Sequence, residues 1–476
     1  MTSSTQAQPT GAVDRFFKIS ERGSSVSQEV RGGLVTFFAM AYIIVLNPLI
    51  IGGFSADQAA TDVEGGWLPN GQVAAVTALV GGLMTLAMGL IANVPFGLAA
   101  GLGINSFLAF GLVGELTWPE AMGLVLINGV IIVVLAATGL RRMIFDAVPP
   151  ALKSAIAVGI GLFIAFIGLK ETGLLVPDPN TFVSVGDLGA RWRPVVTAGV
   201  GFAVAAVLAA RGVGIAVLIG IGASLLTGLA TGITTWHGAV AAPPSVAPTA
   251  FQIDLGFLLT TQGLGLALLF LYTDLFDTVG TLVGVGTQAG LIDDDGRLER
   301  GDRAFFADAV GTVTGALLGT STVTSYIEST AGVTAGARTG LASIVTAALF
   351  LAALFFHPLV ETVGGGVPVE TILFTASGPA THTLFLHPIT APALILVGAM
   401  MAKGLGRIRW DVPQEGIPAF LIVAGIPLTF SIADGISLGV MAWSALAVAT
   451  RDRETPVLLH VLAGVLALRW LSELLG

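Results

Sequence analysis

Cysteine is absent from the 476 residues, and charged residues make up only 11% of them. Without cysteine the chain can form neither a disulfide nor a thiolate metal site. A soluble domain carries about a quarter charged residues, so this composition argues against a surface that mainly faces water. The net charge is −9, and no basic stripe with interleaved aromatic residues is present. We therefore expect no nucleic acid as a partner.

Sequence signals for metal and nucleotide sites are missing as well. The five histidines fall in expected loops, at helix ends or near the C-terminus, without the spacing of a metal site. No Gly-rich loop followed by Lys-Ser or Lys-Thr is present, so we do not expect this chain to hydrolyse ATP. We predict that the chain needs no cofactor. The first 25 residues lack the apolar stretch of a signal peptide, and the first membrane helix is expected to serve as an uncleaved insertion signal.

Hydrophobic residues make up 54% of the chain, and apolar runs of about 20 residues recur from residue 33 onward. These runs predict an all-α polytopic membrane protein with fourteen transmembrane segments in the lipid bilayer. A further apolar stretch, 456–474, fits either an interfacial helix or a fifteenth span. The fourteen predicted segments are 33–53, 73–94, 97–113, 121–140, 151–169, 195–210, 213–232, 256–286, 304–319, 323–337, 340–359, 388–403, 415–430 and 433–450.

Basic residues support this division of the chain. If the N-terminal tail is cytoplasmic, alternate connections should hold most of the Lys and Arg residues. Lys and Arg residues are indeed found in the connections that follow segments four, six, eight, twelve and fourteen. The main exceptions are Lys170, Arg191 and Arg193, which fall on the opposite side. The pattern predicts a multi-pass protein of the cytoplasmic membrane with a cytoplasmic N-terminus.

Fourteen segments divide into two sets of seven, and weak internal similarity points to a duplication. Residues 201–230 resemble 422–449, and residues 149–161 resemble 391–403. Chance similarity between helices rich in Ala, Gly and Leu is the alternative. A repeat with an odd number of segments must emerge inverted, which is a common plan of secondary transporters.

Two carboxylates lie midway along the long apolar segment 256–286. Their spacing places Asp274 and Asp277 on one helical face, which Thr278 and Thr281 continue. Burying one carboxylate at the bilayer centre costs on the order of 3 kcal/mol. We therefore expect this pair around a cavity, a cation or a proton site. The alternative is a carboxylate in helix packing, paired with an Arg or with backbone donors.

The stretch 319–340 is too polar and too rich in Gly for a lipid-facing helix. Irregular backbone at membrane depth must be buried in protein or line a cavity. We predict an extended stretch over about 320–326 and then a half-helix that starts near Glu328, with its free N–H groups toward the membrane centre. In that place Glu328 can accept from a ligand N–H group. A helix cap in a loop is the alternative.

A matching feature lies in the first half of the chain at 95–111, which is again Gly-rich and carries the polar pair Asn105 and Ser106. Pro95 and the glycines predict another extended stretch and half-helix. Broken segments at corresponding places in two halves indicate a binding site near the membrane midplane. Asn105 by itself is a weak signal, because a single Asn often only bonds a neighbouring helix.

Six stretches spread over nearly the whole chain carry a family resemblance. They are RGGLVTFFAMAYIIVLNP (31–48), GLAAGLGINSF (97–107), YTDLFDTVGTLVGVG (272–286), GTSTVTSYIESTAG (319–332), APALILVGAMM (391–401) and IPAFLIVAGIPLTFSIADGI (417–436). With these motifs the chain resembles the nucleobase–cation symporter-2 superfamily, and specifically its AzgA-like branch of purine permeases.

The resemblance implies fourteen helices in two inverted seven-helix repeats, arranged as a core domain and a gate domain, with short strands and half-helices in segments 3 and 10. It also implies import of adenine, guanine and hypoxanthine with protons, by an elevator-type movement of core against gate. A homodimer is left open. The expected limits are a tail at 1–30, a first repeat at 31–250 (core 31–145, gate 146–250), a second at 251–455 (core 251–365, gate 366–455) and a C-terminal apolar helix at 456–476.

The resemblance also implies roles for individual residues. Asp274 and Glu328 occupy the places of the acidic substrate ligands, and Asn105 that of the polar contact in segment 3. Asp277 matches a second carboxylate of this branch, and either it or Glu328 is the expected proton site. Tyr326 is placed to stack on or edge a purine ring. Further polar residues expected at the site are Ser106, Thr278, Thr281 and Thr324.

The expected chemistry suits a neutral purine, because carboxylates accept from its N–H groups while backbone amides donate to its ring nitrogens. The uracil and xanthine branches usually carry Glu where Asp274 stands, so those specificities are not expected. Three alternatives are an anion carrier of the sulfate-permease type, a membrane enzyme that uses Asp274 and Asp277, and a channel. Membrane carboxylates repel an anion, and nothing resembles a selectivity filter. We expect a transporter and not an enzyme.

Overall fold

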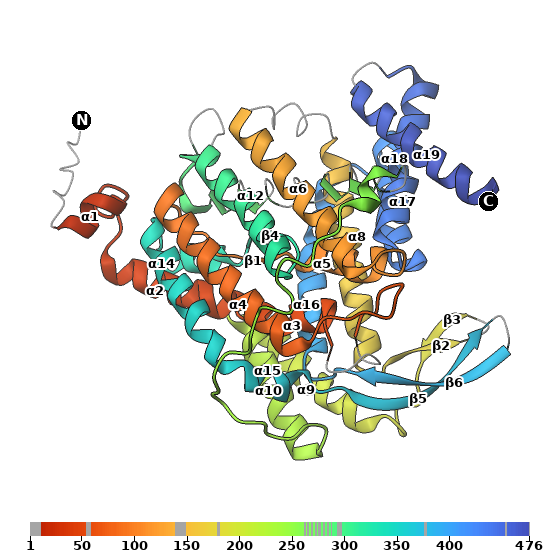
Figure 1. The fold of residues 1–476 in the computed structure, drawn as a ribbon, viewed down its shortest axis with the longest axis horizontal. Coiled ribbons are helices and arrows are strands. Elements are labelled where there is room, and N and C mark those ends of the chain that lie inside the picture. The colour runs from red at the N-terminus through yellow and green to blue at the C-terminus, as the bar shows by residue number, and fades with distance from the viewer. Residues whose placement is uncertain are drawn as a thin grey trace.

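The computed structural model shows helices packed around a central pair of short strands, with two β-hairpins at one end of the molecule (Figure 1). It describes residues 11–475 except 54–58, 139–148, 179–180, 261–262, 264–265, 268–269, 272–273, 275–277, 279–280, 283–284, 287, 293–297, 376–377 and 453–454.

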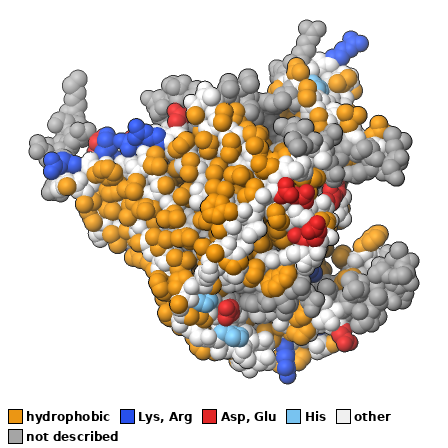
Figure 2. Space-filling model, in the orientation of Figure 1, with side chains coloured by type: hydrophobic (Ala, Val, Ile, Leu, Met, Phe, Trp, Pro, Cys, Tyr) orange, Lys and Arg blue, Asp and Glu red, His pale blue; other side chains and the backbone are white. Residues whose placement is uncertain are grey.

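Within the described part of the chain, six helical stretches are long and apolar enough to cross a membrane. Hydrophobic side chains cover most of the face in Figure 2, whereas Lys and Arg gather near the N-terminal edge. Both observations indicate a multi-pass membrane protein. The six stretches are Val26–Ile51, Asn70–Ala92, Trp118–Thr138, Pro150–Glu171, Trp192–Ala210 and Gly340–Gly364.

The first of these stretches is bent. The sequence predicts one segment at 33–53, but the chain forms α2 (Val26–Met40) and then α3 (Ile43–Ile51), with Tyr42 at the junction. The stretch Gly340–Gly364 is likewise divided, into α14 (Gly340–Ala353), η5 (Leu354–Phe356) and α15 (His357–Gly364). At the first break Tyr42 is buried, whereas at the second break Phe355 and Phe356 are exposed.

Apart from α1 (Ala12–Phe17), which lies in the predicted tail, the remaining helices follow the predicted segments closely. Described positions between 263 and 289 are helical, as expected for the segment that carries Asp274. The stretch 456–474 forms one helix that packs on the preceding helix, α18 (Ile432–Thr450). The other helices are α1 (Ala12–Phe17), α4 (Asn70–Ala87), η2 (Met88–Ala92), α5 (Leu102–Phe107), η3 (Leu108–Leu112), α6 (Trp118–Thr138), α8 (Pro150–Glu171), α9 (Trp192–Ala210), α10 (Ala216–Thr231), η4 (Gly256–Leu259), α12 (Gly301–Leu318), α13 (Ser329–Thr334), α16 (Ala391–Met401), η6 (Ala402–Arg407), α17 (Pro413–Thr429), α18 (Ile432–Thr450) and α19 (Val457–Leu475).

The two broken segments have the predicted form. In the first half β1 (Leu98–Ala100) precedes the short helix α5, and in the second half β4 (Val323–Ser325) precedes the short helix α13. The strands pair antiparallel, with Ala99 opposite Thr324. Strands in segments 3 and 10, each followed by a half-helix, are therefore confirmed.

Two β-hairpins were not predicted. The first pairs β2 (Leu175–Asp178) with β3 (Phe182–Val185), and the second pairs β5 (Val367–Thr375) with β6 (Gly378–Leu386). Each strand of the longer hairpin has nine residues, whereas hydropathy identifies runs of about 20. The sequence of β5 is rich in β-branched and aromatic residues, which favour strands. The fold is therefore helical with two added hairpins and is not purely α.

Glycine allows close packing where the second broken segment meets the first helix. A Cβ atom at Gly332 of α13 would lie 2.0 Å from Oγ1 of Thr36 and 2.5 Å from the carbonyl oxygen of Gly32. Helices α2 and α13 thus approach with their backbones nearly in contact, as small residues permit in membrane proteins.

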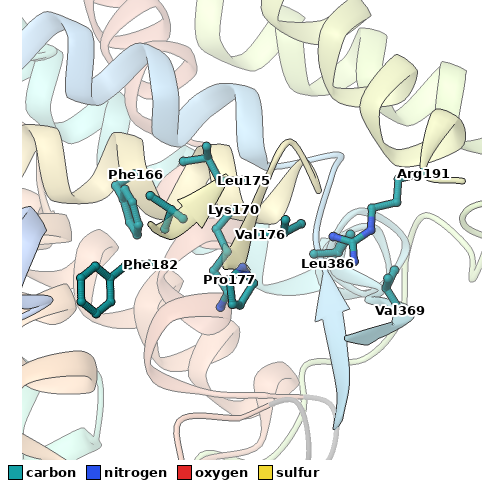
Figure 3. Close-up of a pocket in the computed structure, with 10 residues that line it drawn as sticks. Phe166, Lys170, Leu175, Val176, Pro177, Phe182, Arg191, Val369 and Leu386 are labelled. Carbon is teal, nitrogen blue, oxygen red and sulfur yellow. The ribbon is translucent and has the colours of Figure 1, made fainter. Parts of the chain in front are cut away.

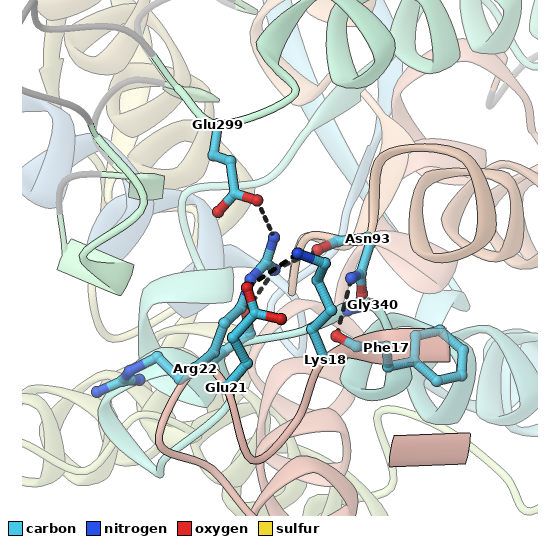
Figure 4. A network of polar contacts seen from close by, with 8 residues as sticks. Phe17, Lys18, Glu21, Arg22, Asn93, Glu299 and Gly340 are labelled. Atoms are coloured by element: carbon cyan, nitrogen blue, oxygen red, sulfur yellow. Dashed lines mark hydrogen bonds and ion pairs between the residues drawn. The ribbon is translucent and has the colours of Figure 1, made fainter. Parts of the chain in front are cut away.

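Arg22 joins three loops to the N-terminal segment (Figure 4). Its Nη1 donates to the carbonyl oxygens of Asn93, at 2.6 Å, and Arg338, at 3.0 Å. Its Nη2 lies 2.9 Å from a carboxylate oxygen of Glu299. The side chain of Arg22 is only 8% exposed, so these contacts are largely shielded from water.

We expect Arg22→Ala to lower the free energy of unfolding by about 2–4 kcal/mol, because it leaves buried acceptors without their charged donor. Lys18→Ala is the matched control, since Lys18 pairs with Glu21 at the surface and such pairs contribute less than about 1 kcal/mol. Melting temperatures of the purified variants in detergent measure the difference. Equal melting temperatures would contradict a stabilising role for Arg22.

Candidate functional site

The candidate site is built around the antiparallel pair of β1 and β4, which we call the strand crossing. The pairing of the strands continues beyond their ends: the N–H of Gly101 donates to the carbonyl oxygen of Thr322, and the N–H of Tyr326 donates to that of Gly97, both at 2.9 Å. The two half-helices thus start close to this crossing. Asn105 and Ser106 lie on α5, and Glu328 immediately precedes α13.

Contacts on both sides of Asp274 place its helix against both broken segments. One turn before it, the ring of Phe270 stacks on Phe107 of α5, with centroids 5.9 Å apart. One turn after it, Oγ1 of Thr278 donates to Oδ2 of Asp308 at 2.7 Å, and Ser325 of β4 donates to the other oxygen of the same carboxylate at 2.8 Å. Because residues four apart share a helical face, Asp274 lies on the face between these two contacts.

Asp274 is fully buried and accepts a hydrogen bond of 2.6 Å from Nδ2 of Asn128 on α6. The Oδ1 atom of Asn128 is buried and, within the described part of the chain, has no hydrogen-bond partner. An acceptor therefore adjoins the carboxylate and is available to a ligand N–H group.

Asp308 of α12 is a buried carboxylate that sequence reasoning missed. It joins the helix of Asp274 to β4 through the two hydroxyl groups just described. The sequence predicts its segment, 304–319, as an apolar span. An acidic residue within an apolar segment is the signal that points to Asp274, and the same signal points to Asp308.

We expect Asp308→Ala to lower the free energy of unfolding by about 3 kcal/mol, because it removes two hydrogen bonds to a charged acceptor and leaves the hydroxyl groups of Thr278 and Ser325 unpaired. Thermal unfolding in detergent measures this loss. Thr314→Val is the control on the same helix, since among the described residues the hydroxyl of Thr314 bonds only the carbonyl oxygen of Val310. Equal losses from both variants would show that the bridge contributes nothing.

Glu328 is held by Tyr42, another residue that sequence reasoning missed. The hydroxyl of Tyr42 donates to Oε1 of Glu328, and Tyr42 is buried at the break between α2 and α3. Glu328 itself is half-buried. The chain has three tyrosines, and two of them, Tyr42 and Tyr326, lie at this site. The sequence signal that points to Tyr42 is a polar aromatic residue inside an apolar span.

Asn105 is fully buried, and its Nδ2 donates to Oδ1 of Asn47 on α3. Asn47 in turn donates to the hydroxyl groups of Thr77, at 2.8 Å, and Thr320, at 3.0 Å. The amide of Asn105 is therefore held in a fixed orientation. Its Oδ1 is buried without a hydrogen-bond partner among the described residues, so this acceptor is available to a ligand.

The other predicted site residues differ in their surroundings. Ser106 donates at 2.9 Å to the carbonyl oxygen of Leu102 in its own helix. The hydroxyl of Tyr326 donates at 2.5 Å to the carbonyl oxygen of Ala100, which fixes its ring beside the strand pair. Thr324 is buried on β4, and Thr281 is half-buried on the helix of Asp274. Asp277 lies outside the described residues.

The chain is similar to permeases along nearly its whole length. It is 36% identical to the adenine permease AdeQ of Escherichia coli, covering 97% of this chain and 96% of that protein. It is 41% identical to the guanine/hypoxanthine permease PbuG of Bacillus subtilis, covering 89% and 91% of the two chains.

The fold resembles that of a solved transporter. The transmembrane domain of the cyanobacterial bicarbonate transporter BicA superposes with a TM-score of 0.57, covering 87% of this chain and 97% of that one at 11% identity. This likeness concerns the fold alone.

A family model, Xan_ur_permease, described as a permease family, matches residues 27–438. The chain therefore belongs to the nucleobase–cation symporter-2 superfamily, in the AzgA-like branch of purine permeases that its motifs had indicated.

Proposed function

We propose that this chain is a secondary active transporter that imports the purine nucleobases adenine, guanine and hypoxanthine. Relatives at 36% and 41% identity are named adenine and guanine/hypoxanthine permeases, which supports this substrate class. The observation that carries the proposal is the set of acceptors around the strand crossing. Asp274, Glu328 and Oδ1 of Asn105 suit the N–H groups along the edge of a purine.

The same set argues against an anion as the substrate, although BicA shares the fold. Asp274 and Glu328 would both repel an anion at close range in a medium of low dielectric constant. Asp308 adds a third carboxylate next to β4. We infer that a neutral purine, with proton symport, is the transported species.

We further propose an elevator-type mechanism, with fourteen spans in two inverted repeats. The core would comprise 31–145 and 251–365, and the gate 146–250 and 366–455. In support, α14 packs on α2 and α4 within the proposed core, and α8 packs on α16 and α17 within the proposed gate. The antiparallel pairing of β1 with β4 also fits two halves of opposite orientation.

The proposed location is the cytoplasmic membrane, with the tail at 1–30 and the N-terminus in the cytoplasm. A homodimer is the proposed alternative to a monomer, and mass determination of the purified protein distinguishes them. The helix at 456–476 lies beyond the two repeats. Accessibility of single cysteines introduced into this cysteine-free chain tests both the sidedness and the placement of that helix.

Uptake by proteoliposomes that contain the full chain tests the proposed substrate. Radiolabelled hypoxanthine should accumulate, and unlabelled adenine, guanine and hypoxanthine should compete, whereas xanthine, uracil and sulfate should not. Sulfate uptake without purine uptake would instead identify an anion carrier. Conversion of a purine by the detergent-solubilised protein, with no need for sealed vesicles, would identify an enzyme.

A further inference from the structure

A small pocket lies beside the two β-hairpins, apart from the strand crossing. Its volume is about 120 Å³, and most of its wall is apolar. Figure 3 shows the side chains that form it. The wall includes Phe166 of α8, Leu175 of β2 and Leu386 of β6. Two cationic side chains, Lys170 and Arg191, complete it.

Arg191 is a cation without a counterion in the described structure. No carboxylate oxygen lies within 4 Å of its guanidinium, and no hydrogen bond from this group is found among the described residues. The side chain is half-buried and points toward Leu386 (Figure 3). Lys170 differs, because its Nζ lies 3.4 Å from Glu171. A partly desolvated cation beside an apolar wall is costly unless an anion joins it.

These residues also explain an irregularity in the sequence. Lys170, Arg191 and Arg193 are the main basic residues that fall outside the alternating charge pattern of the chain. Two of the three line this pocket. Arg191 also lines an adjoining cavity of about 750 Å³, together with Arg193 and the exposed carboxylates Asp187 and Glu370. The small apolar pocket and the wider cavity thus share Arg191 in their walls.

We propose that this pocket binds an amphipathic anion, with its acidic group on Arg191 and its apolar chain against Phe166, Leu175 and Leu386. Arginine holds carboxylates and phosphates through paired N–H donors, which suits either head group. The volume admits a short alkyl segment, while the wider cavity leaves room for the head. A free alkyl carboxylate and an acidic phospholipid share this chemistry.

Binding to the purified full-length protein in a neutral detergent tests the proposal. The probes are octanoate with octanamide as its neutral counterpart, and dioctanoyl phosphatidylglycerol with dioctanoyl phosphatidylcholine. We expect saturable binding of at least one acidic probe and at least tenfold weaker binding of its neutral counterpart. Binding of octanoate alone identifies a free organic anion as the ligand class, and binding of the phosphatidylglycerol alone identifies a lipid.

Variants of Arg191 test whether the acidic probe binds in this pocket. Arg191→Gln should weaken binding of the acidic probe at least tenfold, while Arg191→Lys should retain part of it. Arg211→Gln is the matched control, because Arg211 is an exposed cation at the opposite end of α9 and should bind within twofold of the unaltered protein. Absence of saturable binding, equal binding of the neutral probes, or unchanged binding by Arg191→Gln would overturn the proposal. Each result is independent of purine transport.

Discussion

Replacing Asp274 with Asn is expected to lower the initial rate of purine uptake at least about 100-fold. The exchange keeps the size of the side chain but removes its charge and one of its two acceptors. A hydrogen bond to a charged group contributes about 1.5–3 kcal/mol, and about 2.7 kcal/mol corresponds to the 100-fold loss. The amide would also bring an N–H donor to face the N–H groups of the purine. Uptake of radiolabelled hypoxanthine at low concentration measures this loss.

The control for this prediction is Asp411→Asn, which removes a carboxylate from an exposed position between η6 and α17. Its uptake should match that of the unaltered protein. Asp274→Asn must also remain folded, and a melting temperature close to that of the unaltered protein in the absence of substrate would show this. A folded Asp274→Asn variant with normal uptake would contradict the assignment of Asp274 as a substrate ligand.

Asn128 provides a further test of the same contact. Its amide donates to Asp274, so Asn128→Leu leaves one carboxylate oxygen without this donor in a buried site. We expect uptake to fall about tenfold, which is less than for Asp274→Asn, because the carboxylate of Asp274 remains to bind the purine. The comparison of the two variants separates binding by the carboxylate from its positioning by α6.

The broken segments could be predicted from sequence because their composition conflicts with a lipid-facing helix. Pro95 and the glycines of 95–111, and the hydroxyl-rich run at 319–340, leave backbone groups that lipid cannot satisfy. The structure satisfies them by pairing β1 with β4. The sequence indicated that each segment is irregular. The two segments pair across more than 200 residues of sequence, and only the fold shows that they meet.

The partners of the site residues were harder to predict for the same reason. Tyr42 and Glu328 are 286 residues apart, and Asp308 acts through Thr278 and Ser325. Tyr42 gains its role from the break between α2 and α3, inside a stretch whose hydropathy fits a single span. Polar residues in apolar segments can be recognised by type, but hydropathy does not indicate which of them meet.

The hairpins show a different limit of sequence reasoning. Their strands are short, partly apolar and flanked by membrane helices, so a method based on long apolar runs passes over them. The basic residues beside them were visible as exceptions to the charge pattern. Only the structure brings Lys170 and Arg191 to one pocket, because β2 and β6 supply the wall between them.

Replacing Glu328 with Gln is expected to abolish uphill accumulation of purine while leaving exchange of purine across the membrane. Gln cannot release or take up a proton, so a pH gradient can no longer drive transport through this position. It keeps the shape of the side chain and one acceptor for the purine. Proteoliposomes with an alkaline interior measure accumulation, and counterflow with saturating unlabelled hypoxanthine at equal pH measures exchange.

Two further variants determine whether the proton site is Glu328 itself. Tyr42→Phe keeps the carboxyl group and removes the hydroxyl that donates to it, so coupling should survive with uptake reduced about tenfold, the effect of about 1.4 kcal/mol. Asp277→Asn tests the second carboxylate that the sequence indicates. If accumulation by Glu328→Gln and by Asp277→Asn both still follow the pH gradient, neither residue carries the coupled proton. If only Glu328→Gln loses accumulation, the proton and the purine share one carboxylate, and each turnover must bring both to the crossing of β1 and β4.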